Sequence, residues 1–113
     1  MTNPYNQNLD QNPANHQPLT PLTFLERAAS VFPDQVAIIH GDLRQNYLNL
    51  YTRSVKLSSA LNKAGIKRGD TVSALLPNTP AMLECHYGVP MSGAILHSIN
   101  TRLDPAVISF QLN

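Results

Sequence analysis

Residues 65–80 constrain the fold of this chain most, because a helix end, a turn, a strand and a helix start follow one another there. Gly65 suits the left-handed residue that closes a helix, since it has no Cβ to clash in that conformation. The apolar run 71–76 is typical of a short strand covered on both faces. Pro77 ends that strand, and Thr79-Pro80 supplies an N-cap and a first helical residue. This succession predicts the centre of a βαβ unit.

Similar signals divide the rest of the chain. Thr20 can cap a helix, and Asn46 is a competent N-cap for the helix that Gly65 ends. The helix from Pro80 is apolar nearly all round, so we expect it to be largely buried, with a kink or an early end near Gly88 because of Pro90. The other expected elements are a helix over 21–32, a hairpin of strands 36–40 and 44–47, a strand at 94–97 and a helix from 105.

These elements predict an α/β fold built from βαβ units with a mainly parallel sheet. Two crossovers in series would join strand 36–40 to strand 71–76, and strand 71–76 to strand 94–97. Since no strand follows the last helix, we expect an incomplete N-terminal part of a larger domain. Residues 1–21 are predicted to be an Asn/Gln/Pro-rich extension and residues 22–113 a truncated folded portion.

Composition narrows the classes of function. The chain has 113 residues, a formal net charge of +1 and 42% apolar residues, which fits one small domain and gives no electrostatic reason to bind nucleic acid. Cys85 is the only cysteine, so an internal disulfide is excluded, and a buried structural thiol is favoured over a reactive one. No apolar run is long enough to cross a bilayer, and no signal peptide is evident. We therefore expect a soluble, cytoplasmic protein.

The residues of chemical interest give weak signals. Gly88 and Gly93 have the outer spacing of a phosphate loop, but the Lys and Ser or Thr that should follow are missing. The basic residues between Arg53 and Arg68 are interpreted as a solvated helix face rather than a phosphate site. His97 lies near the carboxyl end of a predicted parallel strand, where α/β sheets bind ligands, although a structural role is favoured.

The loop after that strand holds the most plausible polar cluster, Asn100, Thr101 and Arg102. Loop bracing and helix capping are the favoured interpretation of these three residues. Histidines 16, 40 and 86 have no partner at metal-binding spacing, and Glu84 and His86 diverge around a helix. The sequence therefore assigns no catalytic, cofactor-binding or metal-binding residue.

Four segments carry a resemblance to a known family. Residues 20–29, 64–72, 76–84 and 88–103 are similar to the N-terminal part of an adenylate-forming, AMP-binding acyl-CoA synthetase. The last of them resembles the branch that acts on short- and medium-chain carboxylic acids. The leader is also similar to that branch, which implies that it is ordered. The chain departs from the family at Asn46 and Asn49, where Thr and Glu are usual.

The resemblance implies a ligase of fatty acid and lipid metabolism that converts a carboxylic acid, ATP and CoA into acyl-CoA, AMP and pyrophosphate, with Mg²⁺ on the phosphates. The family's phosphate loop and catalytic lysine lie beyond the position that matches Asn113. We therefore expect the chain to hold no cofactor and to be inactive alone, so whether it is itself an enzyme stays open. The alternative is a non-catalytic interaction module, or a truncated gene product, that needs the missing remainder of the domain to complete its sheet.

Overall fold

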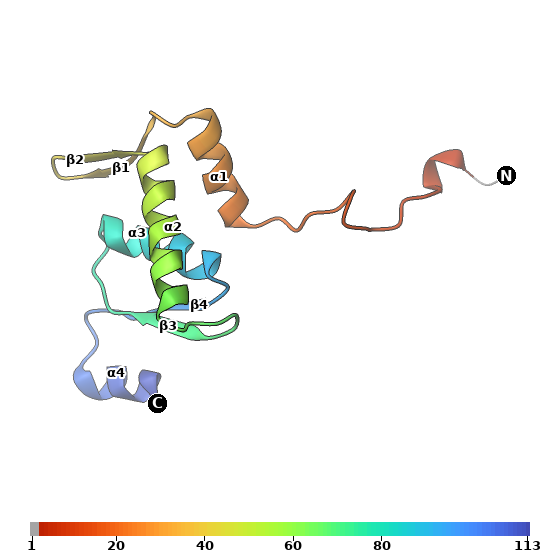
Figure 1. Cartoon of the computed structure of the whole chain (residues 1–113). Helices are drawn as coiled ribbons and strands as arrows, with labels where there is room; N and C mark the ends of the chain where they lie inside the picture. Colours follow the sequence, from red (N-terminus) through yellow and green to blue (C-terminus); the bar gives the residue numbers. More distant parts are fainter. Residues whose placement is uncertain (1–2) are drawn as a thin grey trace.

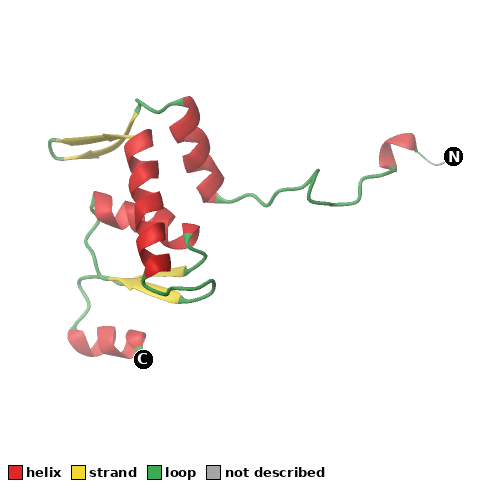
Figure 2. Cartoon of the chain, in the orientation of Figure 1, coloured by secondary structure: helices red, strands yellow, loops and turns green. Residues whose placement is uncertain are grey.

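The computed structural model describes residues 3–113 (Figure 1). After a single 3-10 turn at Pro4–Asn6, the chain forms four helices and four strands that Figure 2 colours by type. In chain order these are α1 (Pro21–Val31), β1 (Val36–His40), β2 (Leu43–Asn46), α2 (Tyr47–Lys63), β3 (Thr71–Ala74), α3 (Pro80–Met91), β4 (Ile95–Ser98) and α4 (Pro105–Leu112).

The strands form two separate two-stranded sheets. β3 and β4 are parallel, with Thr71 opposite Ile95, and α3 connects them, so the predicted α/β fold and this βαβ unit are confirmed. The predicted hairpin is confirmed, since β1 pairs with β2 in antiparallel register. The expected crossover from β1 to β3 is wrong, because these two strands belong to separate sheets. The 17 residues of α2 explain this result. A helix of that length spans about 25 Å, and it places the hairpin and the β3–β4 sheet at opposite ends (Figure 1).

The end of α2 and the start of β3 follow the sequence prediction closely. Gly65 has φ +93°, the left-handed conformation expected of a closing glycine. Its N–H donates to the carbonyl of Asn62, and the N–H of Ile66 donates to the carbonyl of Leu61, each at 3.1 Å. This pair of bonds is the Schellman motif, which satisfies carbonyls that the helix end leaves without partners. The chain therefore enters β3 through a fixed turn.

We expected a kink or an early end of α3 near Gly88, but the helix continues to Met91. Pro90 lies in its last turn, so the ring removes only one hydrogen bond of the helix. The N–H groups of Ser92 and Gly93 then close the helix with bonds to the carbonyls of Val89 and Pro90, at 3.0 and 2.9 Å. A proline this close to the C-terminus is tolerated because few helical bonds remain to be lost.

The buried residues lie where α1, β1, α2 and α3 meet. Leu25, Ile38 and Leu50 form one cluster, and Val89 of α3 is almost completely buried. Burial of α3 is less complete than expected, because Leu83 remains exposed. The core therefore covers one side of α3 and leaves the other side open.

β3 and β4 are covered on one face only, although their apolar run is typical of strands covered on both faces. Five side chains form the open face of the sheet, namely Thr71, Ser73, Leu75, Ile95 and His97. α3 contacts the opposite face. Figure 1 shows α4 beyond the sheet, on the side away from α2, and α4 has no buried residue.

The described part of the leader extends away from the folded body (Figure 1). Residues 3–19 are all exposed, and the molecule measures 66 × 39 × 27 Å. None of the helices in the described part of the chain is long and apolar enough to cross a membrane.

Candidate functional site

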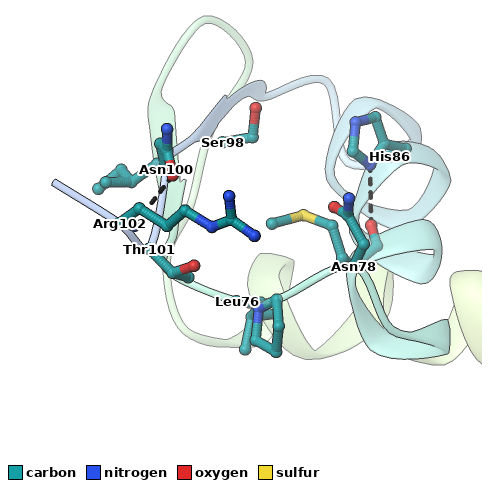
Figure 3. A pocket seen from close by; sticks show the side chains of 10 residues that line it. Leu76, Asn78, His86, Ser98, Asn100, Thr101 and Arg102 are labelled. Carbon is teal, nitrogen blue, oxygen red and sulfur yellow. Dashed lines mark hydrogen bonds between the residues drawn. The ribbon is translucent and has the colours of Figure 1, made fainter.

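A cavity of about 750 Å³ opens at the carboxyl ends of β3 and β4 (Figure 3). This is the edge of a parallel sheet at which α/β proteins bind ligands. Its walls come from the segment after β3, the first turns of α3, the end of β4 and the loop that follows. The lining residues are Leu76, Pro77, Asn78, Met82, His86, Ser98, Ile99, Asn100, Thr101 and Arg102.

The polar cluster predicted from the sequence lies on one wall of this cavity. Ile99 anchors the loop, since it is buried and its N–H donates to the carbonyl of Ala74 at 2.9 Å. Asn100 Oδ1 then accepts from the N–H of Arg102 at 2.9 Å. Asn100 therefore braces the loop as interpreted, while the side chain of Arg102 extends into the cavity (Figure 3). A guanidinium in that position offers several N–H donors to an anionic group.

His86 and Asn78 lie on the opposite wall, and the sequence had not pointed to either. His86 Nδ1 lies 2.8 Å from the carbonyl oxygen of Met82, one helical turn earlier. Because a carbonyl oxygen only accepts hydrogen bonds, Nδ1 carries the hydrogen, and Nε2 remains an acceptor in the neutral ring. The signal that could have found both residues is their place after the carboxyl end of β3, Asn78 in the segment before α3 and His86 in the second turn of that helix.

His97 lies outside this cavity. Its Nδ1 is 3.1 Å from Ser73 Oγ, across the β3–β4 ladder. Both side chains belong to the open face of the sheet, because the two residues are opposite each other in the parallel register. The position of His97 agrees with the structural role favoured from the sequence.

Among the basic residues between Arg53 and Arg68, Arg53 has a structural role. Arg53 of α2 forms a two-pronged ion pair with Glu84 of α3, from Nε to Oε1 and from Nη2 to Oε2, the second at 3.1 Å. Glu84 is buried while the Arg53 side chain is 54% exposed. The hydrogen bond from Arg53 to Glu84 raises the pKa of this guanidinium further above its ordinary value. The pair therefore joins α2 to α3, a contact that the sequence reasoning missed.

Cys85 has the environment of a structural thiol. Its side chain is half-buried, and burial is the main cause that raises the pKa of the thiol, with the charge of Glu84 as the second. A raised pKa keeps the sulfur in its unreactive protonated form at neutral pH.

Of the two glycines with the spacing of a phosphate loop, Gly88 has a packing role. A Cβ on Gly88 would lie 2.8 Å from Leu57 Cδ2 and 2.9 Å from the carbonyl oxygen of Ser54, so α3 approaches α2 closely there. Gly93, with φ +85°, lies in the turn after α3. These positions do not form a phosphate loop. Residues 3–113 also hold no group of three His, Cys, Asp or Glu side chains placed to bind a metal ion.

Comparisons with known proteins agree on one family. The model of the AMP-binding enzymes matches residues 25–113. The chain is 45% identical over 104 residues to an acetate–CoA ligase of Humulus lupulus, which covers 92% of this chain and 18% of the relative. It is 46% identical over 96 residues to a peroxisomal benzoate–CoA ligase of Arabidopsis thaliana, which covers 85% of this chain and 17% of the relative.

The solved structures that resemble this chain are also CoA synthetases. A fatty acyl CoA synthetase of Mycobacterium tuberculosis superposes with a TM-score of 0.76 at 31% identity, over 80% of this chain and 18% of that one. The o-succinylbenzoate CoA synthetase of Bacillus subtilis, solved with its acyl-adenylate, gives 0.75 at 26% identity, over 79% of this chain and 23% of that one. The chain thus spans less than a quarter of the length of these relatives.

Proposed function

Since this chain belongs to the family of AMP-binding enzymes, we propose that it forms the N-terminal part of an ATP-dependent carboxylate–CoA ligase. The reaction joins a short- or medium-chain carboxylic acid to CoA with the conversion of ATP to AMP and pyrophosphate. The match of residues 25–113 to the family model carries this proposal. The names of the relatives, which include acetate–, butyrate– and benzoate–CoA ligases, support the class of substrate.

The cavity at the carboxyl ends of β3 and β4 is the part of the chain that suits this reaction. A carboxylate, ATP and CoA are all anions, and Arg102 extends a cation into the cavity. Such a charge orients an anionic group through charge-assisted hydrogen bonds. We assign the cavity to the substrate-binding surface of the whole ligase, with Arg102 as its anion-binding residue and with Asn78 and His86 on the facing wall.

The chain by itself is proposed to be inactive. No lysine lines the cavity, and the described residues bring no acidic cluster together for Mg²⁺. A phosphoryl-bearing substrate needs cations and metal-bound oxygens to stabilise the charge that develops in the transition state. Exchange of labelled pyrophosphate into ATP by the purified chain, above the level of a mock preparation and in the presence of butyrate, would contradict this part of the proposal.

A chimera tests the function directly. The chain replaces the matching segment of the Humulus lupulus acetate–CoA ligase, and acyl-CoA formation is measured with acetate, butyrate and benzoate. We expect activity with at least one of these acids. Arg102→Ala should lower kcat/KM for a substrate by about 10-fold or more, because a charged hydrogen bond to that substrate is lost. Arg27→Ala, an exposed position on α1, is the matched control. A folded chimera that forms no acyl-CoA would overturn the proposal.

The proposed cellular setting is fatty acid and lipid metabolism in the cytoplasm. Several relatives are named as peroxisomal enzymes, so the location needs its own measurement. Fractionation of the source cells with an antibody to the leader would decide it, since a signal in the organelle fraction contradicts the cytoplasmic assignment.

A further inference from the structure

His86 meets the cavity at the carboxyl ends of β3 and β4 with a fixed hydrogen-bonding character. Its Nδ1 lies 2.8 Å from the carbonyl oxygen of Met82, so the hydrogen of the neutral ring is held there. The ring cannot shift this hydrogen to Nε2 without losing that bond. Figure 3 shows the other ring nitrogen turned toward the cavity, on the side of Ser98 and Arg102. The neutral ring therefore presents only a lone pair to the cavity.

A lone pair does not suit the group on the facing wall. Arg102 extends its guanidinium into the same cavity, and a guanidinium attracts an anion. An anionic oxygen only accepts hydrogen bonds, so it gains no bond from a neutral His86. Protonation reverses this, because the imidazolium donates from both nitrogens and carries a positive charge. The cavity then has a cationic donor on each of two facing walls.

The other charged groups around His86 do not neutralise it. Among residues 3–113, no Asp or Glu lines this cavity or the neighbouring groove of about 300 Å³ that His86 also lines. His40 of β1 lines that groove, and α1, α2, β3 and β4 contribute no titratable side chain to either space. Glu84, the carboxylate nearby on α3, is paired with Arg53 of α2. A protonated His86 therefore finds its counter-charge in a bound anion.

We propose that His86 is a proton-dependent anion-binding residue, so that the cavity holds an anionic ligand more tightly as the pH falls. The inference rests on the proposed function, since it concerns the same substrate-binding surface. Binding of the proton and binding of the anion are linked, because each strengthens the other by the same factor. The cavity thus responds to pH over the range in which histidines change charge, between about pH 5 and 8.

The test uses the purified chain and sulfate, an anion whose charge is constant over this range. NMR titration gives the dissociation constant of sulfate at the two ends of the range. We expect sulfate to bind about 5-fold or more tightly at the acid end. The imidazole nitrogen signals of His86 should show the hydrogen on Nδ1 in the neutral ring. The midpoint of its protonation should move to higher pH when sulfate is present, which is the reciprocal effect.

Three variants assign the effect to its residue. His86→Asn keeps a donor near the carbonyl of Met82 but cannot gain a proton, so sulfate binding should lose its pH dependence and stay weak. Arg102→Ala should weaken sulfate binding at both ends of the range by about 10-fold or more, because a charged hydrogen bond is lost. His40→Asn is the matched control, since His40 lines the neighbouring groove and not the cavity, and it should keep the full pH dependence.

Several results would overturn the inference. One is sulfate that does not bind, or that binds equally well at both ends of the range. Another is a pH dependence that survives in His86→Asn or disappears in His40→Asn, with both variants folded by circular dichroism. A third is a hydrogen on Nε2 of the neutral ring. If His86→Asn does not fold, the midpoint of His86 protonation in the unchanged chain decides the question, since sulfate must move it.

The outcomes for this inference and for the ligase proposal are distinguishable. Sulfate binding that depends on pH through His86, together with a folded chimera that makes no acyl-CoA, supports the role of His86 and removes the ligase proposal. An active chimera, together with sulfate binding that does not depend on pH, supports the ligase proposal and removes the role of His86.

Discussion

Among single residues, Gly88 decides how closely α3 packs on α2. We predict that Gly88→Ala destabilises the chain by about 1–2 kcal/mol in urea unfolding. The gain in helix propensity, up to about 1 kcal/mol, is smaller than the cost of overpacking, about 1–3 kcal/mol. The added Cβ would lie 2.9 Å from the backbone oxygen of Ser54, and a backbone atom cannot rotate away.

Ser59→Ala on the exposed side of α2 is the matched control for this change. It should alter the free energy of unfolding by less than about 0.5 kcal/mol. A Gly88→Ala variant as stable as the unchanged chain would mean that α2 and α3 separate at no cost.

Cys85 gives a prediction about pH. Because burial raises the pKa of its thiol in the folded chain, the rate of alkylation by iodoacetamide should reach half its maximum at a higher pH in the folded chain than in 6 M urea. Its stabilising contribution is complete below the unfolded pKa, about 8.5, and is lost as the pH rises through the folded value.

The single cysteine makes this measurement specific, since all label reports on one site. Cys85→Ala should remove its part of the pH dependence of stability. Equal midpoints in the folded chain and in urea would show that the thiol is not shielded.

Among the helices, α2 and α3 have N-caps that look alike in sequence and differ in structure. Asn46 Oδ1 accepts from the N–H of Asn49 at 2.8 Å, which is a working cap. Thr79 makes no such bond, and its hydroxyl donates to the carbonyl of Pro77 at 3.3 Å. We predict that Asn46→Ala costs about 1 kcal/mol of stability and that Thr79→Ala costs less than about 0.5 kcal/mol.

Thermal and urea unfolding of the two variants side by side checks this difference. Equal losses would show that the hydrogen bond of Asn46 contributes nothing beyond its place at the helix start. The comparison is internally matched, because both positions precede a helix and both adopt extended backbone.

Local signals predicted the elements well, because a cap or a turn is decided by a few neighbouring residues. The sequence located Gly65 at the end of α2 and Thr20 as the cap of α1 correctly. Contacts between distant segments were not predictable in this way. The separation of β1 from β3, the Arg53–Glu84 pair and the place of His86 depend on how whole helices are oriented, which no local pattern records.

In the candidate site too, local features were predictable and contacts between distant segments were not. The loop 100–102 was identified because it follows a predicted strand of a parallel sheet. Its bracing role is confirmed by the hydrogen bond that Asn100 accepts, while the extension of Arg102 into a cavity was not predicted. Asn78 could not be assigned, because only the fold brings it opposite Arg102.

For the molecule as a whole, the leader contributes the least to stability. The hydrogen bonds of residues 3–16 are all local, and Leu9 and Leu19 are exposed. We predict that removal of residues 1–18 changes the free energy of unfolding by less than about 0.5 kcal/mol. Thr20, which caps α1, is retained in this variant.

Limited proteolysis gives a second measurement of the same property, since exposed segments without buried contacts are cut first. Early fragments should begin within residues 3–19. A loss of more than about 1 kcal/mol on truncation would favour the ordered leader that the family resemblance implied, docked on the body.

The parallel pairing of β3 with β4 has a consequence for how the chain reaches its structure. Ser73 and His97, opposite each other in this ladder, are only 24 residues apart in sequence, and β1 and β2 meet within one hairpin. Closing such short loops costs little entropy, and topologies with low contact order fold quickly. Both sheets can therefore form on a nascent polypeptide from local segments alone.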